Sequence, residues 1–126
     1  SNADYRQKPT LHRDDRGTLF EVIKLEQGGQ MFYSTTRPGI VRGNHYHTRK
    51  LEKFCVIKGE AIIRLRRIGT DNVIEYRVSG QEPAFVEMPI FYTHNKENVG
   101  QDDLHALFWT NELYDPADPD TFYEQV

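Results

Sequence analysis

Two histidines and a glutamate near the middle of the chain have side chains that can bind a metal. One residue separates His45 from His47, and four more separate His47 from Glu52. Side chains two positions apart in a β-strand point to the same face, so both imidazoles can enter one cavity. Imidazole nitrogens and a carboxylate are suitable ligands for a divalent transition metal. The spacing therefore favours a metal site, if the chain brings Glu52 back beside the two histidines.

The segments around these residues indicate how the chain can do so. Residues 53–57 are apolar and aromatic enough to form a strand, with Glu52 at its start. Gly39 and Gly59 stand at the two ends of the whole stretch, where glycine is typical of a turn. We expect a hairpin that joins the histidine strand to the strand after Glu52, which places the carboxylate beside the imidazoles.

Other short segments of β-branched and apolar residues recur along the chain, with turn residues between them. In residues 60–67, Ala61, Ile63 and Leu65 alternate with other side chains, as in a half-buried strand. The remaining expected strands are 18–25, 30–36, 73–78, 84–88 and 104–110. Residues 4–15 are expected to form an arm or loop, and two Asp-Pro pairs interrupt regular structure in the tail. With no helical period, the pattern predicts an all-β barrel or sandwich.

Composition limits the classes of function. The chain has 126 residues, the size of a single domain, and a formal net charge of −3. This charge gives no indication of nucleic-acid or anionic-membrane binding, and no apolar run or secretory signal is present. The lone Cys55 lies in an apolar strand, which favours packing over chemistry. We expect a cytoplasmic protein whose domain is 4–126, since Ser1-Asn2-Ala3 is typical of residues left by tag removal.

The metal-binding stretch resembles a known motif. The first cupin motif has its residue types at these spacings, matched here by Gly39, His45, His47, Glu52 and Gly59. The second cupin motif is matched by Pro89, His94 and Asn98, although Phe91 stands where that family usually has glycine. The chain thus resembles the cupin superfamily, which implies a double-stranded β-helix, the cupin jelly-roll barrel. The resemblance also implies that His94 is a fourth metal ligand, and we expect the divalent metal to be zinc.

Further stretches narrow the resemblance. Asp15-Arg16-Gly17 and Arg42-Gly43-Asn44-His45-Tyr46 are similar to the deoxysugar-nucleotide epimerases. The tail, from Trp109 onwards, is similar to the C-terminal cupin domain of bifunctional capsule and O-antigen epimerase-reductases. This similarity implies C3 epimerisation of a UDP-linked 4-keto-6-deoxy-N-acetylhexosamine, and then reduction at C4 with NADPH by a reductase domain or partner protein. The chain has no Gly-x-Gly-x-x-Gly turn between a strand and a helix, so we expect no nicotinamide site in it.

Epimerisation beside a carbonyl needs a base, an acid on the opposite face and a group that stabilises the enolate. The epimerase resemblance implies that His45 is the base, whereas the cupin motif makes it a ligand, and one lone pair cannot serve both roles at once. Tyr46 and Tyr92 are candidate acids, or else aromatic residues of the core. The cationic residues near the motif can hold a pyrophosphate or form only a solvated rim: Arg37, Arg42, Arg49, Lys50 and Lys53.

Other functions fit the same residues. The ligand set also suits a metal-dependent oxygenase, and the barrel also suits a non-catalytic sugar-binding cupin or a metal-free polar network. The residues before His45 and the tail favour the epimerase. We also expect a homodimer, because an open sheet edge often closes against a partner, with Phe20 and Val22 in the expected contact.

Overall fold

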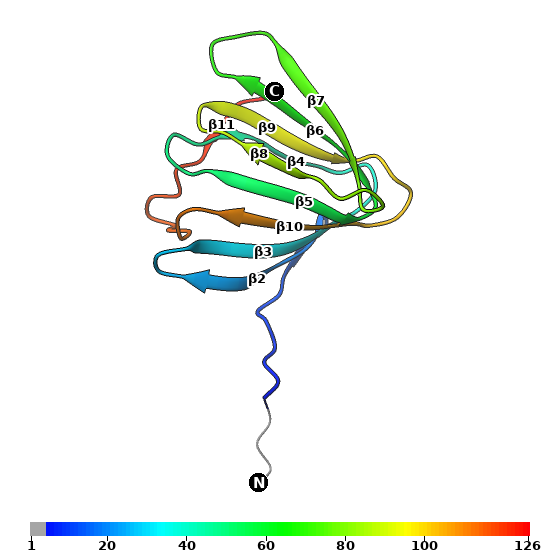
Figure 1. Cartoon of the computed structure of the whole chain (residues 1–126), viewed down its shortest axis with the longest axis vertical. Coiled ribbons are helices and arrows are strands. Elements are labelled where there is room, and N and C mark those ends of the chain that lie inside the picture. The colour runs from blue at the N-terminus through cyan, green and yellow to red at the C-terminus, as the bar shows by residue number, and fades with distance from the viewer. Residues whose placement is uncertain (1–4) are drawn as a thin grey trace.

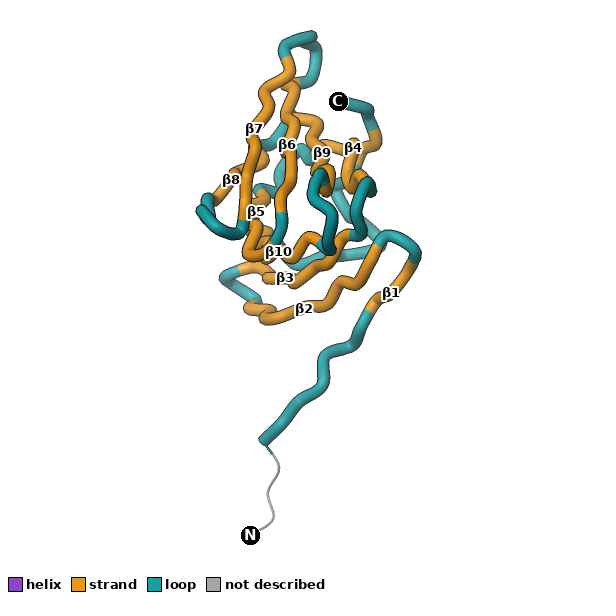
Figure 2. Tube along the Cα trace, turned by 90° about the vertical axis from the view of Figure 1, so that its right-hand side faces the viewer, coloured by secondary structure: helices purple, strands orange, loops and turns teal. Residues whose placement is uncertain are grey.

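The computed structural model describes residues 5–126, whose regular structure consists of eleven strands (Figures 1 and 2). One sheet has the order β1 (His12–Asp14), β2 (Gly17–Leu25), β3 (Gly29–Thr36), β10 (Leu104–Thr110), β5 (Glu52–Lys58) and β8 (Phe85–Met88). The other has the order β11 (Phe122–Tyr123), β4 (Val41–Tyr46), β9 (Tyr92–Asn98), β6 (Glu60–Arg67) and β7 (Val73–Ser79). The expected tag residues 1–3 lie outside the described range, in which we find no helix able to cross a membrane.

The expected hairpin between the histidine strand and the Glu52 strand is wrong. The histidine strand, β4, pairs with β9 and β11 in one sheet, while β5 pairs with β10 and β8 in the other. The short segment after Tyr46 therefore crosses from one sheet to the other instead of turning back within one ladder. Glu52 still comes close to the histidines, because the inward faces of the two sheets meet in the interior of the barrel.

The hydrophobic core confirms the alternation expected for residues 60–67. In β6, Ala61, Ile63 and Leu65 are all at most 4% exposed, and they pack against residues of the facing sheet. Phe54 and Leu104 belong both to this core and to the lining of a cavity. The core therefore adjoins the cavity, and its packing determines which side chains of the neighbouring strands point inward.

The other expected strands are confirmed to within a residue or two at their ends. Three strands were not expected: β9, which lies in the stretch matched to the second cupin motif, and the two short strands β1 and β11. Strand β1 lies inside the segment expected to be an arm, and β11 lies in the tail after the Asp-Pro pairs. Strand β1 pairs with β2, and β11 pairs with β4, each over a few residues. Strands this short do not show a hydrophobic period in the sequence. Residues 5–11 run away from the barrel, as Figures 1 and 2 show.

Candidate metal centre

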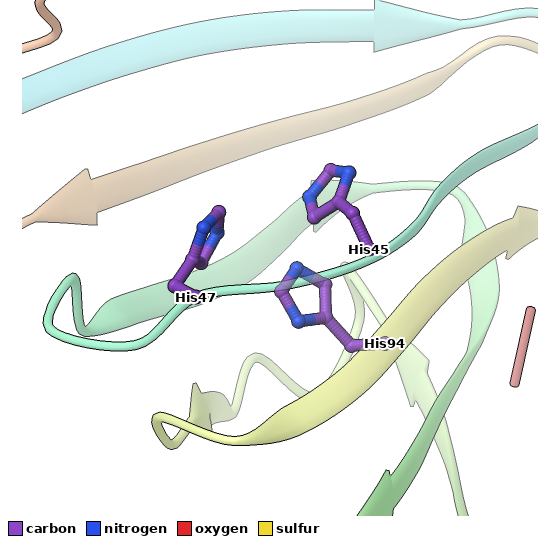
Figure 3. A group of neighbouring side chains, drawn as sticks. All are labelled: His45, His47 and His94. Carbon is purple, nitrogen blue, oxygen red and sulfur yellow. The ribbon is translucent and has the colours of Figure 1, made fainter. Parts of the chain in front are cut away.

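Three histidines meet at the inner face of the sheet that contains β4 and β9. His45 lies in β4, His47 directly follows that strand, and His94 lies in β9 opposite His45. One ligand nitrogen from each imidazole lies within 4.8 Å of the other two. Figure 3 shows the three rings gathered together, two of them from one segment and His94 from β9. The same-face argument for His45 and His47 therefore holds in the folded chain.

A bulge in β4 sets the position of His45. The pairing register with β9 shifts between Gly43 and His45, and the φ angles of Gly43 and Asn44 are 106° and 59°. A Cβ atom on Gly43 would lie 2.7 Å from the His94 carbonyl oxygen, so any larger residue would push the strands apart. Glycine is therefore required where the backbones of the two histidine strands approach.

Two of the imidazoles, His45 and His94, are held neutral. Burial lowers the pKa of His94 to about 3, and burial together with the charge of Lys96 lowers the pKa of His45 to about 4. The Nδ1 atom of His47 lies 2.7 Å from the Asp120 carbonyl oxygen, to which it donates. The Nε2 atoms of His47 and His94 are buried without a hydrogen-bond partner. Buried acceptors of this kind require a ligand, and a divalent cation bound by neutral imidazole fits them.

Glu52 borders this cluster from the facing sheet. Its Oε2 atom lies 3.6 Å from His94 Nε2 and 3.1 Å from the ammonium nitrogen of Lys96. Burial is the largest influence on Glu52 and raises its pKa, but the charge of Lys96, the interactions with His94 and His47 and the hydrogen bond from Lys96 together outweigh burial and lower the pKa to about 2. The carboxylate is therefore ionised and shared between a lysine and the histidine cluster.

Lys96 was missed by the sequence reasoning. It lies on β9 two positions after His94, and so shares the inward face. Its ammonium nitrogen lies 4.7 Å from the ring centre of Phe54 and 5.2 Å from that of Phe108. The same spacing of two residues, from His94 to Lys96, predicts that Lys96 shares the inward face. It was overlooked because lysine is not part of a metal-ligand motif.

A cavity with two arms opens beside the cluster, and Leu19, His45, Glu52 and Phe108 line both arms. The basic arm, of about 190 Å³, is lined further by Arg16, Ser34, Thr36, Arg42, Lys96 and Leu104, among others. The wide arm, of about 530 Å³, is lined further by Gln30, Phe32, His47, Lys50, Tyr114 and Thr121, among others. The histidine cluster therefore lies where a small ligand could reach it from either arm of the cavity.

Two of the five cationic residues expected to hold a pyrophosphate line this cavity. Arg42 lies in the basic arm, where its guanidinium donates to the Thr36 hydroxyl and to the Thr35 carbonyl, both at 2.9 Å. Burial lowers the pKa of Arg42, and neither contact supplies a negative charge. Lys50 lines the wide arm and donates to the Pro119 carbonyl at 3.0 Å. Arg42 is therefore a partly desolvated cation that an anionic ligand can reach.

The other expected binding residues lie elsewhere. Arg37 is exposed, and Lys53 points to the outer face of β5, where its nitrogen lies 3.9 Å from Glu87. Arg49 forms ion pairs with Glu112 and Asp118 of the tail. None of these three cations lines either arm. All five cations lie near the first motif in the sequence, so their sequence positions did not show which of them point into the cavity and which point outward.

The two tyrosines expected as acids also lie outside the cavity. Tyr46 points away from His45 and stacks on Phe122 of β11, with the ring centres 5.3 Å apart. Tyr92 packs against the hydrophobic core. Neither ring lines either arm of the cavity. The surroundings of both rings fit the alternative that they are packing aromatics, and we no longer propose them as acids.

The tail contributes a residue that sequence reasoning did not single out. Asp120 is 3% exposed, and its carboxylate accepts hydrogen bonds from the backbone N–H groups of Thr48, Arg49 and Lys50. Burial opposes the charge, but the hydrogen bonds from Thr48 and the other donors outweigh it and hold the pKa of Asp120 well below its usual range. The segment between His47 and Glu52 is thus fastened to the tail.

Residues 12–122 match the family described as the polysaccharide biosynthesis C-terminal domain. The chain belongs to this family. It is 42% identical over 112 residues to the UDP-2-acetamido-2,6-beta-L-arabino-hexul-4-ose reductase of Pseudomonas aeruginosa, covering 89% of this chain and 30% of that protein. It is 26% identical over 124 residues to the spore coat polysaccharide biosynthesis protein SpsL of Bacillus subtilis, covering 90% of this chain and 82% of that protein. The chain thus spans less than a third of the first of these relatives.

Solved structures confirm the fold. The capsular polysaccharide assembling protein CapF of Staphylococcus aureus superposes with a TM-score of 0.96 at 42% identity, covering 98% of this chain and 33% of that chain. Oxalate decarboxylase of Lactobacillus farciminis superposes with a TM-score of 0.69 at 18% identity, covering 94% of this chain and 33% of that chain. The predicted double-stranded β-helix and the predicted resemblance to C-terminal cupin domains of this family are therefore confirmed.

Proposed function

We propose that this domain epimerises C3 of a UDP-linked 4-keto-6-deoxy-N-acetylhexosamine in bacterial capsular polysaccharide or O-antigen biosynthesis. The observation that carries the proposal is the cluster of three imidazoles beside a cavity that also contains the charged pair Glu52 and Lys96. The name of the Pseudomonas aeruginosa relative specifies a UDP-linked hexul-4-ose, a 4-keto sugar, and that of the Staphylococcus aureus neighbour specifies capsule assembly. Both names support the substrate class.

The metal ligands in this proposal are His45, His47 and His94, with Glu52 as the fourth. The two Nε2 atoms without a partner and the neutral state of the His45 and His94 rings favour a divalent ion, for which we propose zinc. A divalent cation bound there supplies a Lewis acid that polarises a keto oxygen. This assignment gives the lone pair of His45 to the metal, so His45 is no longer proposed as the free base.

Lys96 and Glu52 then face the substrate. The Lys96 ammonium, held at 3.1 Å from Glu52 and lining the basic arm, places positive charge where an enolate develops negative charge. The C3 proton is expected to move to an ionisable residue of the cavity, since the two tyrosines lie outside it. The apolar surface of Phe54 and Phe108 beneath Lys96 keeps water from this part of the site.

The cations of the basic arm suit the diphosphate of the substrate. Arg16 and Arg42 both line this arm, and the charge of Arg16, which pairs with Asp14 at 2.6 Å, disfavours the charge of Arg42. A diphosphate relieves this repulsion and accepts the guanidinium hydrogen bonds that remain free on Arg42. In the wide arm, Lys50 is the cation that we propose for binding the diphosphate. In this proposal Arg37 and Lys53 have no role in binding.

Proton exchange in heavy water tests the proposal. The metal-loaded domain is incubated with a UDP-4-keto-6-deoxy-N-acetylhexosamine, without NADPH, because epimerisation moves a proton and no net electrons. Deuterium should appear at C3 together with the inverted sugar, while C5, the other carbon beside the ketone, stays protonated. Absence of deuterium at C3 across a panel of such substrates would contradict the proposal and leave a sugar-binding domain, provided that the substrates still bind.

The partner proposals follow from the relatives. The name of the Pseudomonas aeruginosa protein specifies a reductase, and this chain matches 30% of it, so we propose that a reductase domain or partner protein consumes the epimerised product. We further propose a cytoplasmic homodimer. On β2, Val22 and Ile23 are 50% and 47% exposed, and this strand pairs with β1 only at its first residues, which leaves an open sheet edge.

A further inference from the structure

The tail fastens the loop of the metal centre through a single carboxylate. Asp120 accepts from the Thr48 hydroxyl at 2.6 Å, from the Thr48 N–H at 3.1 Å, from the Arg49 N–H at 2.8 Å and from the Lys50 N–H at 3.0 Å. These donors follow directly after His47, at the point where the chain crosses between the sheets. One side chain therefore supplies the hydrogen bonds that shape the turn between His47 and Glu52.

The same residue touches His47 through its backbone. The Asp120 carbonyl oxygen lies 2.7 Å from Nδ1 of His47, and both groups are buried. A carbonyl oxygen can only accept, so Nδ1 carries the proton and the lone pair is left on Nε2. That Nε2 atom is buried without a partner, and His47 belongs to the cluster in which one ligand nitrogen of each ring lies within 4.8 Å of the others.

The backbone of Asp120 has a conformation that needs support. Its φ angle is 52°, in the left-handed region that is uncommon for residues other than glycine, although aspartate tolerates it better than most. The hydrogen bonds of the carboxylate hold the residue in this conformation, and the conformation directs the carbonyl at His47. The carboxylate thus acts on the imidazole through its own main chain.

We propose that Asp120 is a positioning residue of the metal centre, which fixes His47 as the Nδ1–H tautomer so that Nε2 is presented to the cation. The inference depends on the metal role proposed above, but not on the epimerase reaction. Outer partners of this kind orient ligating histidines, and their loss typically lowers metal affinity by about 10- to 100-fold. No other residue of the tail donates to or accepts from the His47 ring in the described part of the chain.

The test compares three variants of the whole chain. Asp120→Asn keeps the size of the side chain but turns an amide NH₂ towards a ring of donors, so it should disturb the turn most. Thr48→Val removes one donor and is the milder variant, useful if the first does not fold. Arg66→Met is the control, because Arg66 anchors the same tail elsewhere, at Glu124 and the Gln125 carbonyl, both at 2.8 Å.

Two measurements apply to each variant, and neither is enzyme activity. Nitrogen-15 NMR of the imidazoles in the metal-free protein reports which ring nitrogen of His47 carries the proton. Competition with a chelator gives the affinity for zinc. In Asp120→Asn the Nδ1–H preference of His47 should be lost and zinc should bind about tenfold more weakly or worse. Thr48→Val should change both in the same direction by a smaller factor, and Arg66→Met should change neither.

Three outcomes would overturn the inference. The first is wild-type His47 protonated on Nε2 in the metal-free protein. The second is zinc affinity within about threefold of wild type in both Asp120→Asn and Thr48→Val. The third is an equal loss in Arg66→Met, which would assign the effect to general anchoring of the tail. If the heavy-water experiment fails while these results hold, the epimerase proposal falls and the role of Asp120 stands.

Discussion

Replacing Lys96 with methionine should destabilise the metal-free protein by about 3–5 kcal/mol at pH 7. In the wild type, the ammonium lies 3.1 Å from the carboxylate of Glu52, which is 7% exposed. Removal of one partner leaves a buried charge without its counter-ion, and this accounts for the size of the loss. Methionine keeps most of the apolar contact with Phe54 and Phe108, so packing contributes little. Adding Glu52→Gln removes the stranded charge and should recover at least about 1 kcal/mol.

Urea denaturation with a chelator present measures these differences. For a slope of about 2 kcal/mol per molar urea, the midpoint of Lys96→Met should fall by about 1.5–2.5 M. The matched control is Lys53→Met, whose ammonium lies 3.9 Å from an exposed carboxylate on the outer face and should change stability by less than about 0.5 kcal/mol. A loss in Lys96→Met no larger than in the control, or a double variant as unstable as Lys96→Met, would refute the reasoning.

Four further outcomes are expected. Glu52, with its pKa lowered from 4.5 to about 2, contributes stability only while ionised, so thermal melts of the metal-free protein should fall in temperature as the pH drops from about 4.5 towards 2, and less steeply in Glu52→Gln. Elemental analysis should show much less zinc per chain in His94→Ala; full occupancy would remove His94 from the ligand set. His45→Asn removes a ligand of the proposed Lewis acid and should slow C3 exchange by at least about a hundredfold, and exchange near the wild-type rate would exclude an essential His45. Light scattering should give about twice 14.8 kDa, whereas a monomer mass at micromolar concentration would exclude the dimer.

Local pattern was enough to predict most of the strands, because apolar and β-branched segments stand between turn residues, and in β6 the burial also has a period of two. The alternation in β6 is the clearest case, since Ala61, Ile63 and Leu65 all reach the core. Strand partners were harder to predict. The motif spacing indicates that Glu52 meets the histidines but does not say through which ladder, and the chain crosses between sheets where a hairpin was expected.

In the candidate site, too, some residues could be predicted from local sequence and others could not. His45 and His47 come together as their spacing predicted, and His94 joins them as the cupin resemblance implied. Tyr46 adjoins His45 in sequence, and for that reason it points to the opposite face of β4. Asp120 lies more than seventy positions from His47, and no local pattern indicates that its carboxylate caps the turn after that histidine. Contacts of this length depend on the whole fold.

The central claim is that the imidazole cluster activates C3 of a 4-keto sugar nucleotide. The most direct test is the mass and NMR spectrum of the substrate recovered from heavy water, with the protein metal-loaded, metal-stripped and reloaded. The account predicts one deuterium, at C3, in the loaded and reloaded samples, with NADPH absent throughout. It predicts little or none in the stripped sample. Equal exchange with and without metal, or exchange at C5 alone, would contradict it.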